Sequence, residues 1–158
     1  MEQCYYIKYT EVNYEINKDF FDLIEIEPFG NCFYCCISYY LCKHLNSHLE
    51  LREEVFQYIN DNRNLFYNWF EDYEDNNNLT IDEMLDNYIF EYNREGEYAG
   101  ELEFAAICKL YKLRIIFLIL GFYGYIVYNS LCDEDYDDKT NHTIYLLYKN
   151  SNLSIIWI

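Results

Sequence analysis

The last third of the chain constrains the fold most, because it contains an almost unbroken run of apolar residues at 113–120. A run of this kind is typical of a strand that is covered on both faces. Further apolar segments at 125–128, 143–148 and 153–158 predict three more strands, and the polar residues 149–152 predict a hairpin loop between the last two. A sheet buried in this way needs helices packed against it.

Two amphipathic helices are predicted in the first half of the chain. Apolar residues recur every four positions after Cys32, and the same spacing returns after position 50 with glutamates between the apolar residues. Each pattern places one apolar stripe along a helix. The stripes consist of Phe33, Ile37, Leu41 and Leu45, and of Leu51, Val55 and Ile59.

Two further helices are predicted from their first residues. Thr80 and Glu83 have the spacing of a capping box, in which each side chain accepts a hydrogen bond from the backbone amide of the other residue. Gly100 precedes the second of these helices, whose small residues Ala105 and Ala106 permit close packing. Helices followed by strands predict an α+β fold, and we expect one domain that spans residues 1–158.

The charge balance favours some partners over others. The 158 residues include 11 Lys and Arg against 28 Asp and Glu, so the net charge is −17. A surface this acidic repels polyanions, which argues against nucleic acid and anionic membranes as partners. It favours a protein partner that has a basic face.

The cysteines and the N-terminal segment predict a cytoplasmic protein with reduced thiols. Seven cysteines cannot all pair within one chain, and their spacing is not that of a disulfide framework. Residues 1–20 mix charged and polar residues among tyrosines, without the apolar core of a secretory signal. We therefore expect the cysteines to be free.

Cys32 is the most informative single residue. It follows Gly30 and Asn31, which favour a turn, and it begins the first predicted helix. Backbone amides and the helix dipole at this position stabilise a thiolate, which is the nucleophilic form of cysteine. The same amides can face a developing oxyanion. The placement suits a buried structural cysteine equally well, because free cysteines are among the most buried residues.

A metal or redox site is a third alternative for this segment. Cys32 and Cys35 have a C-x-x-C spacing, and Cys36 follows directly. A zinc site normally needs a second pair of ligands, which Cys108 and Cys132 do not supply. A thioredoxin-like pair belongs in a βαβ unit, and the sequence shows no such pattern. We therefore expect no metal and no cofactor.

Several segments of the chain, taken in order, resemble one family. Residues 28–37 (PFGNCFYCCI) are similar to the Asp-Gly-Asn-Cys segment of ovarian-tumour-domain (OTU) cysteine proteases. The resemblance continues at Leu51 and Arg52, and it returns at 98–106 (YAGELEFAA), which is similar to the family's Trp-Gly-Gly-x-x-Glu-Leu-x-Ala segment. It covers residues from about 15 to 158. It implies a papain-related α+β fold in which helices pack on a small, mostly antiparallel sheet.

The resemblance also implies a substrate and a site. OTU proteases remove ubiquitin or ubiquitin-like modifiers from other proteins. By the resemblance, Cys32 is the nucleophile that attacks the isopeptide carbonyl, and the backbone of Phe29, Gly30 and Asn31 forms the oxyanion hole. We expect the Cys32 sulfur to face solvent in a groove that accepts a flexible, glycine-ended tail. The acidic surface suits ubiquitin, which presents a basic face.

The general base has two candidate positions. The family places its histidine where the last strand begins, and Asn152 occupies the matching position in this chain. In a second register His142 is the base, and residues 149–158 are an addition after the family's last strand. The two positions lie about 20 Å apart along a hairpin, at ~3.3 Å per residue, so only one of them can face Cys32. In addition, the family's Asp three residues before the nucleophile is Phe29 here.

Two functions are therefore predicted. The first is a cysteine isopeptidase for ubiquitin or a ubiquitin-like modifier, with Cys32 as nucleophile and His142 as base. The second is a catalytically inactive OTU-like module that binds ubiquitin or another protein. In the second case Cys32 is present without its base, because the amide of Asn152 cannot accept the thiol proton near neutral pH.

Overall fold

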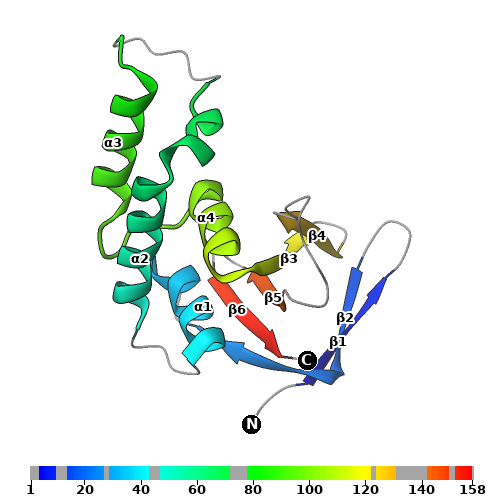
Figure 1. Cartoon of the computed structure of the whole chain (residues 1–158). Helices are drawn as coiled ribbons and strands as arrows, with labels where there is room; N and C mark the ends of the chain where they lie inside the picture. The colour runs from blue at the N-terminus through cyan, green and yellow to red at the C-terminus, as the bar shows by residue number, and fades with distance from the viewer. Residues whose placement is uncertain are drawn as a thin grey trace.

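The helices of the chain lie beside a curved sheet in the computed structural model (Figure 1). The structure describes residues 4–9, 14–26, 29–42, 47–71, 78–121, 124–130, 142–149 and 152–157. The helices are α1 (Cys32–Cys42), α2 (His48–Asp61), α3 (Ile81–Tyr92) and α4 (Glu101–Tyr111), with the short 3₁₀ turns η1 (Arg63–Leu65) and η2 (Tyr67–Trp69) after α2. The strands are β1 (Cys4–Tyr9), β2 (Tyr14–Glu25), β3 (Leu113–Gly121), β4 (Gly124–Ser130), β5 (His142–Lys149) and β6 (Asn152–Trp157).

The predicted α+β fold is confirmed. The helices predicted from Cys32, around Leu51, after Thr80 and after Gly100 are α1 to α4, in that order. The four strands predicted in the last third are β3 to β6. Within the described ranges, no helix is both long enough and apolar enough to cross a lipid bilayer.

The sheet is mostly antiparallel and curls back on itself. Its strand order is β1-β2-β4-β3-β5-β6, and among the pairings of the described residues only that of β3 with β5 is parallel. Residues 22–25 of β2 pair with residues 154–157 of β6. At the other end of β2, Tyr14 pairs with Tyr125 of β4. The long β2 therefore contacts two strands that lie at opposite sides of the β3-β5 pair.

The two N-terminal strands correct one prediction. Helices were predicted first and strands last, and no element was assigned before Cys32, but β1 and β2 occupy that part of the chain. β2 joins the sheet by pairing with β6 at the opposite end of the sequence. Strand formation depends strongly on such distant neighbours, so the residues of β2 alone do not mark it as clearly as a local pattern marks a helix.

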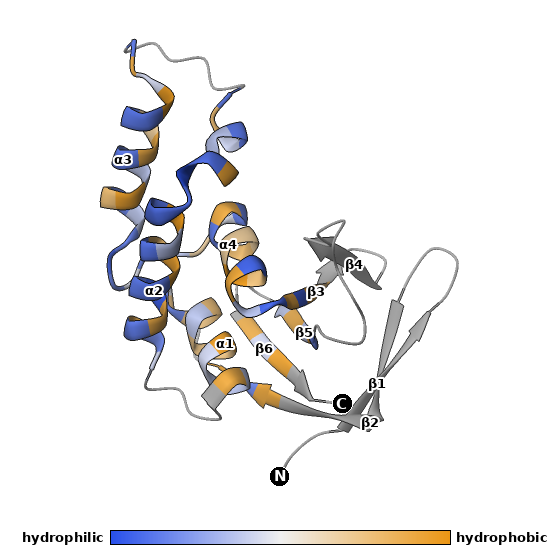
Figure 2. Cartoon of the chain, in the orientation of Figure 1, coloured by the Kyte–Doolittle hydropathy of each residue, from blue (hydrophilic) through white to orange (hydrophobic). Residues whose placement is uncertain are grey.

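The apolar core lies between the helices and the sheet. Figure 2 shows hydrophobic residues where α1, α4 and β6 lie together and hydrophilic residues on the outer turns of α2 and α3. The α2 stripe is confirmed, since Leu51, Val55 and Ile59 are all buried. The small residues Ala105 and Ala106 of α4 are buried as well, which allows close packing.

The buried face of α1 differs in part from its predicted stripe. Phe33 and Ile37 are buried, but Leu41 is 37% exposed, and Leu45 lies outside the described residues. Leu41 lies in the last turn of α1, one residue before the helix ends at Cys42. Cys36 occupies the buried face with Ile37.

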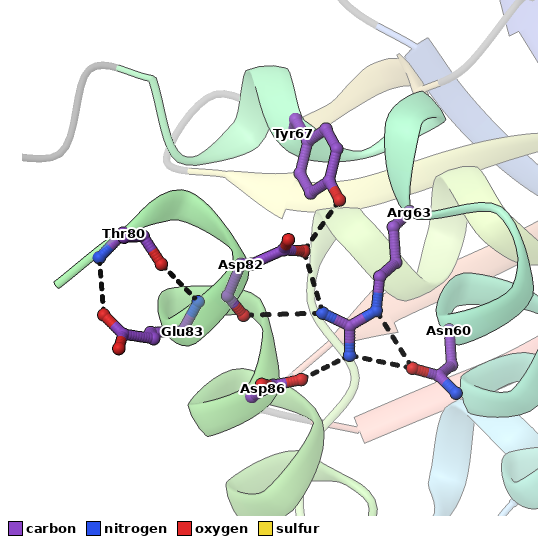
Figure 3. A network of polar contacts seen from close by, with 7 residues as sticks. All are labelled: Asn60, Arg63, Tyr67, Thr80, Asp82, Glu83 and Asp86. Carbon is purple, nitrogen blue, oxygen red and sulfur yellow. Dashed lines mark hydrogen bonds and ion pairs between the residues drawn. The ribbon is translucent and has the colours of Figure 1, made fainter.

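The start of α3 forms as predicted. The Glu83 amide donates to Thr80 Oγ1 at 3.2 Å, and the Thr80 amide donates to Glu83 Oε2 at 2.8 Å (Figure 3). Both halves of the capping box are therefore present.

A surface network centred on Arg63 ties α3 to the end of α2 (Figure 3). The Arg63 guanidinium donates to Asp82 Oδ1 at 3.0 Å, to Asp86, and to Asn60 Oδ1 at 2.8 and 3.1 Å. The Tyr67 hydroxyl donates to Asp82 Oδ1 at 2.7 Å. The hydrogen bonds from Tyr67 and Arg63 lower the pKa of Asp82, because they stabilise its carboxylate.

Candidate active site

Cys32 is the first residue of α1, as predicted. Its backbone amide donates to the carbonyl of Phe29 at 2.8 Å, which closes a turn over residues 29–32. The Cys35 amide then donates to the carbonyl of Asn31 at 2.9 Å and starts the helix. The local sequence therefore sets both the turn and the position of the thiol.

The Cys32 sulfur is surrounded by backbone amides, but it does not face solvent. Burial raises the pKa of the Cys32 thiol, and hydrogen bonds from the backbone amides of Leu153, Phe33 and Cys32 itself oppose that shift. The residue is only 4% exposed, so the prediction of a solvent-facing sulfur is wrong. In its exposure Cys32 corresponds to the alternative of a buried cysteine.

The raised pKa values of buried groups in α1 and α3 predict that the protein loses stability in alkali. Burial is the first cause that raises the pKa of the Cys32 and Cys36 thiols and of the Tyr34 and Tyr88 hydroxyls. The unfolded chain loses these protons near the ordinary values of 9.0 and 10.0, while the folded chain keeps them. Each thiol therefore lowers the free energy of unfolding above about pH 9, and each hydroxyl above about pH 10, by up to about 1.4 kcal/mol per pH unit and group.

Urea unfolding at a series of pH values between about 8 and 10.5 measures this slope. Tyr34→Phe provides the control, because the Tyr34 hydroxyl is buried and finds no hydrogen-bond partner among the described residues. The variant should keep its stability near neutral pH and lose less of it above pH 10. A free energy of unfolding that stays level across the series would contradict the prediction.

The structure brings Cys32 together with the start of β6 and not with His142. Asn152 is the first residue of β6, and the amide of its neighbour Leu153 hydrogen bonds to the Cys32 sulfur. Leu153 pairs with Tyr148 of β5, and His142 begins β5 six residues earlier. At ~3.3 Å per residue, His142 is about 20 Å along the strand from that pair.

His142 has different neighbours at the other end of β5. The side chain is exposed, its amide donates to the carbonyl of Lys112 at 3.2 Å, and the residue lies opposite Leu113 at the start of β3. The alignment that makes His142 the base treated residues 149–158 as an addition after the family's last strand. In the structure β6 is an integral strand that pairs with both β5 and β2. A catalytic role for His142 therefore finds no support in its position.

The turn before Cys32 packs closely against a second segment of backbone. Gly30 is buried, and a Cβ atom on it would lie 1.7 Å from the carbonyl oxygen of Gly96. The Asn31 Oδ1 accepts a hydrogen bond from the Gly96 amide at 2.9 Å. Phe29 remains 57% exposed at the edge of this contact. The oxyanion-hole role of the backbone of Phe29, Gly30 and Asn31 stays a prediction.

One buried glutamate of α4, Glu103, was not predicted from the sequence. Glu103 is fully buried in α4, where it accepts hydrogen bonds from the Tyr88 hydroxyl at 2.7 Å and from the Gly100 amide at 2.9 Å. Burial raises its pKa, although these hydrogen bonds and nearby Arg52 oppose that shift. The signal was present, because a glutamate three residues after Gly100 repeats the spacing of Glu83 after Thr80.

The cysteines of α1 do not assemble a metal site in the described part of the chain. Cys32 and Cys36 are free thiols. Over the residues that the structure describes, no three His, Cys, Asp or Glu side chains form a group that could hold a metal ion. Cys132 lies outside the described residues.

Comparisons with known proteins agree with this architecture. The OTU domain of OTUD1 superposes with a TM-score of 0.70, at 21% sequence identity over 87% of this chain and 86% of that chain. The viral OTU protease of Qalyub virus gives a TM-score of 0.63 at 19% identity, over 97% and 98% of the two chains. An OTU deubiquitinase from Wolbachia pipientis, solved bound to ubiquitin, gives 0.57 at 18% identity, over 86% and 94%. At these identities the likeness shows a shared fold.

The sequence leads to the same family. No curated protein matches the chain. A family model for OTU-like cysteine proteases, however, matches residues 27–154, which include α1 and the start of β6. The chain therefore belongs to the OTU-like cysteine protease family.

Proposed function

We propose that this chain is an OTU-family module that recognises ubiquitin or a ubiquitin-like protein without hydrolysing its isopeptide bond. The observation that carries the proposal is the hydrogen bond from the Leu153 amide to the Cys32 sulfur. It makes position 152 the neighbour of the thiol, and that position holds an asparagine.

The chemistry of a thiol protease needs a base beside the thiol. A cysteine attacks a carbonyl as the thiolate, and an adjacent histidine normally accepts the proton. The carboxamide of Asn152 has no such basicity near neutral pH. Burial also holds the Cys32 thiol in its protonated form. Phe29, in place of the family's aspartate, adds no polar group to assist.

Recognition of ubiquitin is supported by the structural neighbours and by charge. OTU domains from Wolbachia pipientis and Hazara virus, and a further OTU domain, have been solved with ubiquitin bound. The net charge of −17 favours a partner with a basic face. Phe29 and Tyr98, each 57% exposed, are the chain neighbours of Gly30 and Glu97, whose backbones pack together, and they offer aromatic contact area near the turn that precedes Cys32.

Titration of the chain with ubiquitin and with ubiquitin-like proteins tests the proposal. We expect saturable binding by calorimetry or NMR and no cleavage of diubiquitin. Phe29→Ala and Tyr98→Ala should each weaken binding about tenfold, as truncation of an interface aromatic often does. Phe90→Ala is the matched control, because it also removes an exposed aromatic ring. Phe90 is 80% exposed on α3, and the rings of Tyr88 and Tyr92, two residues to either side of it, pack against each other.

Two outcomes would contradict the proposal. If neither ubiquitin nor any ubiquitin-like protein binds at high micromolar concentration, recognition fails. If the chain cleaves diubiquitin, the proposed absence of hydrolysis fails, and the second candidate function stands.

That second candidate is a cysteine isopeptidase with Cys32 as nucleophile. Its supporting observation is the set of backbone amides around the sulfur at the start of α1, which lowers the energy of a thiolate. A partner that opened the site to solvent would remove the opposing effect of burial. Labelling of Cys32 by a ubiquitin probe distinguishes the two candidates.

A further inference from the structure

Arg52 is an unusual residue for the interior of a domain. It lies in α2 and is only 3% exposed, whereas arginine side chains normally keep their charge in water. Burial at this position lowers the pKa of its guanidinium. A buried cation of this kind requires polar partners, and those of Arg52 identify its role.

The guanidinium donates to three separate segments of the chain. Nη1 donates to the carbonyl of Tyr92, at the end of α3, at 2.9 Å. Nη2 donates to the carbonyl of Glu97 at 2.7 Å and to Asn31 Oδ1 at 2.9 Å, with the carbonyl of Gly30 at 3.4 Å. The planar, rigid fork of arginine can serve several acceptors at once, whereas a lysine ammonium acts as a single point charge.

The same side chain also contacts the first turn of α1. The Arg52 Cζ atom lies 4.2 Å from the centre of the Tyr34 ring, and Tyr34 is two residues beyond Cys32. Arg52 is therefore in contact with the chain on both sides of the thiol. Asn31 completes the connection, because its Oδ1 accepts from Arg52 and from the Gly96 amide together.

A purely electrostatic role, as counter-ion of the buried Glu103, does not account for this arrangement. The carboxylate of Glu103 takes its hydrogen bonds from the Tyr88 hydroxyl and the Gly100 amide. The hydrogen bonds of Arg52 go to backbone carbonyls and to Asn31, which define the geometry of the turn.

We propose that Arg52 is the positioning residue that clamps the turn at 29–31 between α2 and the segment at 92–97, and thereby fixes the Cys32 sulfur under the amides that surround it. Arg52 acts through Asn31 and the turn and does not touch the sulfur itself. The proposal stands apart from ubiquitin recognition, because it concerns how the chain holds its own thiol.

Alkylation of the folded chain with iodoacetamide tests the proposal. The rate at Cys32 is measured by peptide mass spectrometry and divided by the rate at Cys108, which lies in α4. Both residues are buried, at 4% and 7% exposure, so each reacts when its own surroundings open. In Arg52→Lys we expect this ratio to rise about tenfold or more, because a single ammonium group cannot replace the guanidinium fork at all of its acceptors and leaves some of them without their donor.

Three further variants separate positioning from general loss of stability. Asn31→Ala removes the shared acceptor and should raise the ratio, while Asn31→Asp keeps an oxygen there and should restore it. Arg63→Ala removes an arginine that makes five side-chain hydrogen bonds, against four for Arg52, in a network that does not include the turn. It should leave the ratio unchanged, even if both rates rise.

The outcomes decide the proposal in either direction. A ratio that stays at the wild-type value in Arg52→Lys, with circular dichroism showing a folded chain, overturns it. So does an equal rise in Arg63→Ala. If Arg52→Lys does not fold, the Asn31 pair decides: a rise in Asn31→Ala that Asn31→Asp reverses supports the clamp, and equal ratios in the two variants overturn it.

Discussion

Replacing Asn152 with histidine is expected to produce rapid labelling of Cys32 by a ubiquitin probe that carries a C-terminal electrophile, where the natural chain reacts little. The Leu153 amide hydrogen bonds to the Cys32 sulfur, which makes residue 152 a backbone neighbour of the thiol, and we expect an imidazole introduced there to reach it. Histidine accepts the thiol proton near neutral pH, and the resulting imidazolium stabilises the thiolate. A positioned base contributes about 10²–10⁴-fold, and we expect an increase of about 10²-fold.

Three variants make this experiment specific. Asn152→Ala should stay as unreactive as the natural chain, and Cys32→Ala in the Asn152→His background should abolish labelling. His142→Ala in the same background should change nothing, because His142 lies about 20 Å along β5 from the level of Leu153. Iodoacetamide applied in parallel reports the new base without requiring ubiquitin to bind.

One result would reverse the assignment. If the natural chain labels rapidly and His142→Ala alone stops the reaction, His142 is the base, and the placement of Cys32 beside position 152 does not describe the reacting state. The chain would then be an isopeptidase. Weak labelling in every variant, with normal ubiquitin binding, would show that burial of Cys32 limits its reactivity more than the missing base does.

The helices were predictable because their signals are local. The Thr80 and Glu83 pair marks a helix start within four residues, and Leu51, Val55 and Ile59 mark a buried face within three turns. The strand β2 carries no comparable signal. Its place in the sheet depends on β6, which the chain supplies only at its other end.

The position of Cys32 at a helix start was predictable from the sequence, and its surroundings were not. A turn before a helix placed Cys32 correctly, but its exposure depends on which segments cover the sulfur, and β6 is among them. The choice between Asn152 and His142 likewise depended on the register of β5 with β6. From the sequence, Arg52 was noted only as part of the resemblance to OTU proteases, and no role was predicted for it. Its role becomes visible once Asn31 and Glu97, from distant parts of the chain, lie around its guanidinium.

Gly30→Ala is expected to destabilise the fold strongly. The new Cβ atom would lie 1.7 Å from the carbonyl oxygen and 2.3 Å from the carbonyl carbon of Gly96. Both are backbone atoms, so no side-chain rotation can relieve the overlap, and the segments at 30 and 96 must move apart. That movement also separates acceptors that Arg52 joins, since Arg52 donates to Asn31 on one side and to Glu97 on the other. We expect a loss of about 3 kcal/mol or more in the free energy of unfolding.

Gly100→Ala is the matched control, because it adds the same methyl group where the neighbours can adjust. Its Cβ atom would lie 3.3 Å from the Tyr88 hydroxyl and 3.4 Å from Glu103 Oε2, both of which end side chains. We expect a loss of about 1 kcal/mol in the free energy of unfolding, since alanine is also a poorer N-cap residue than glycine. Urea unfolding of the two variants measures both values. Equal losses would mean that the contact between Gly30 and Gly96 is looser than its geometry indicates, and that the turn before Cys32 does not depend on close backbone packing.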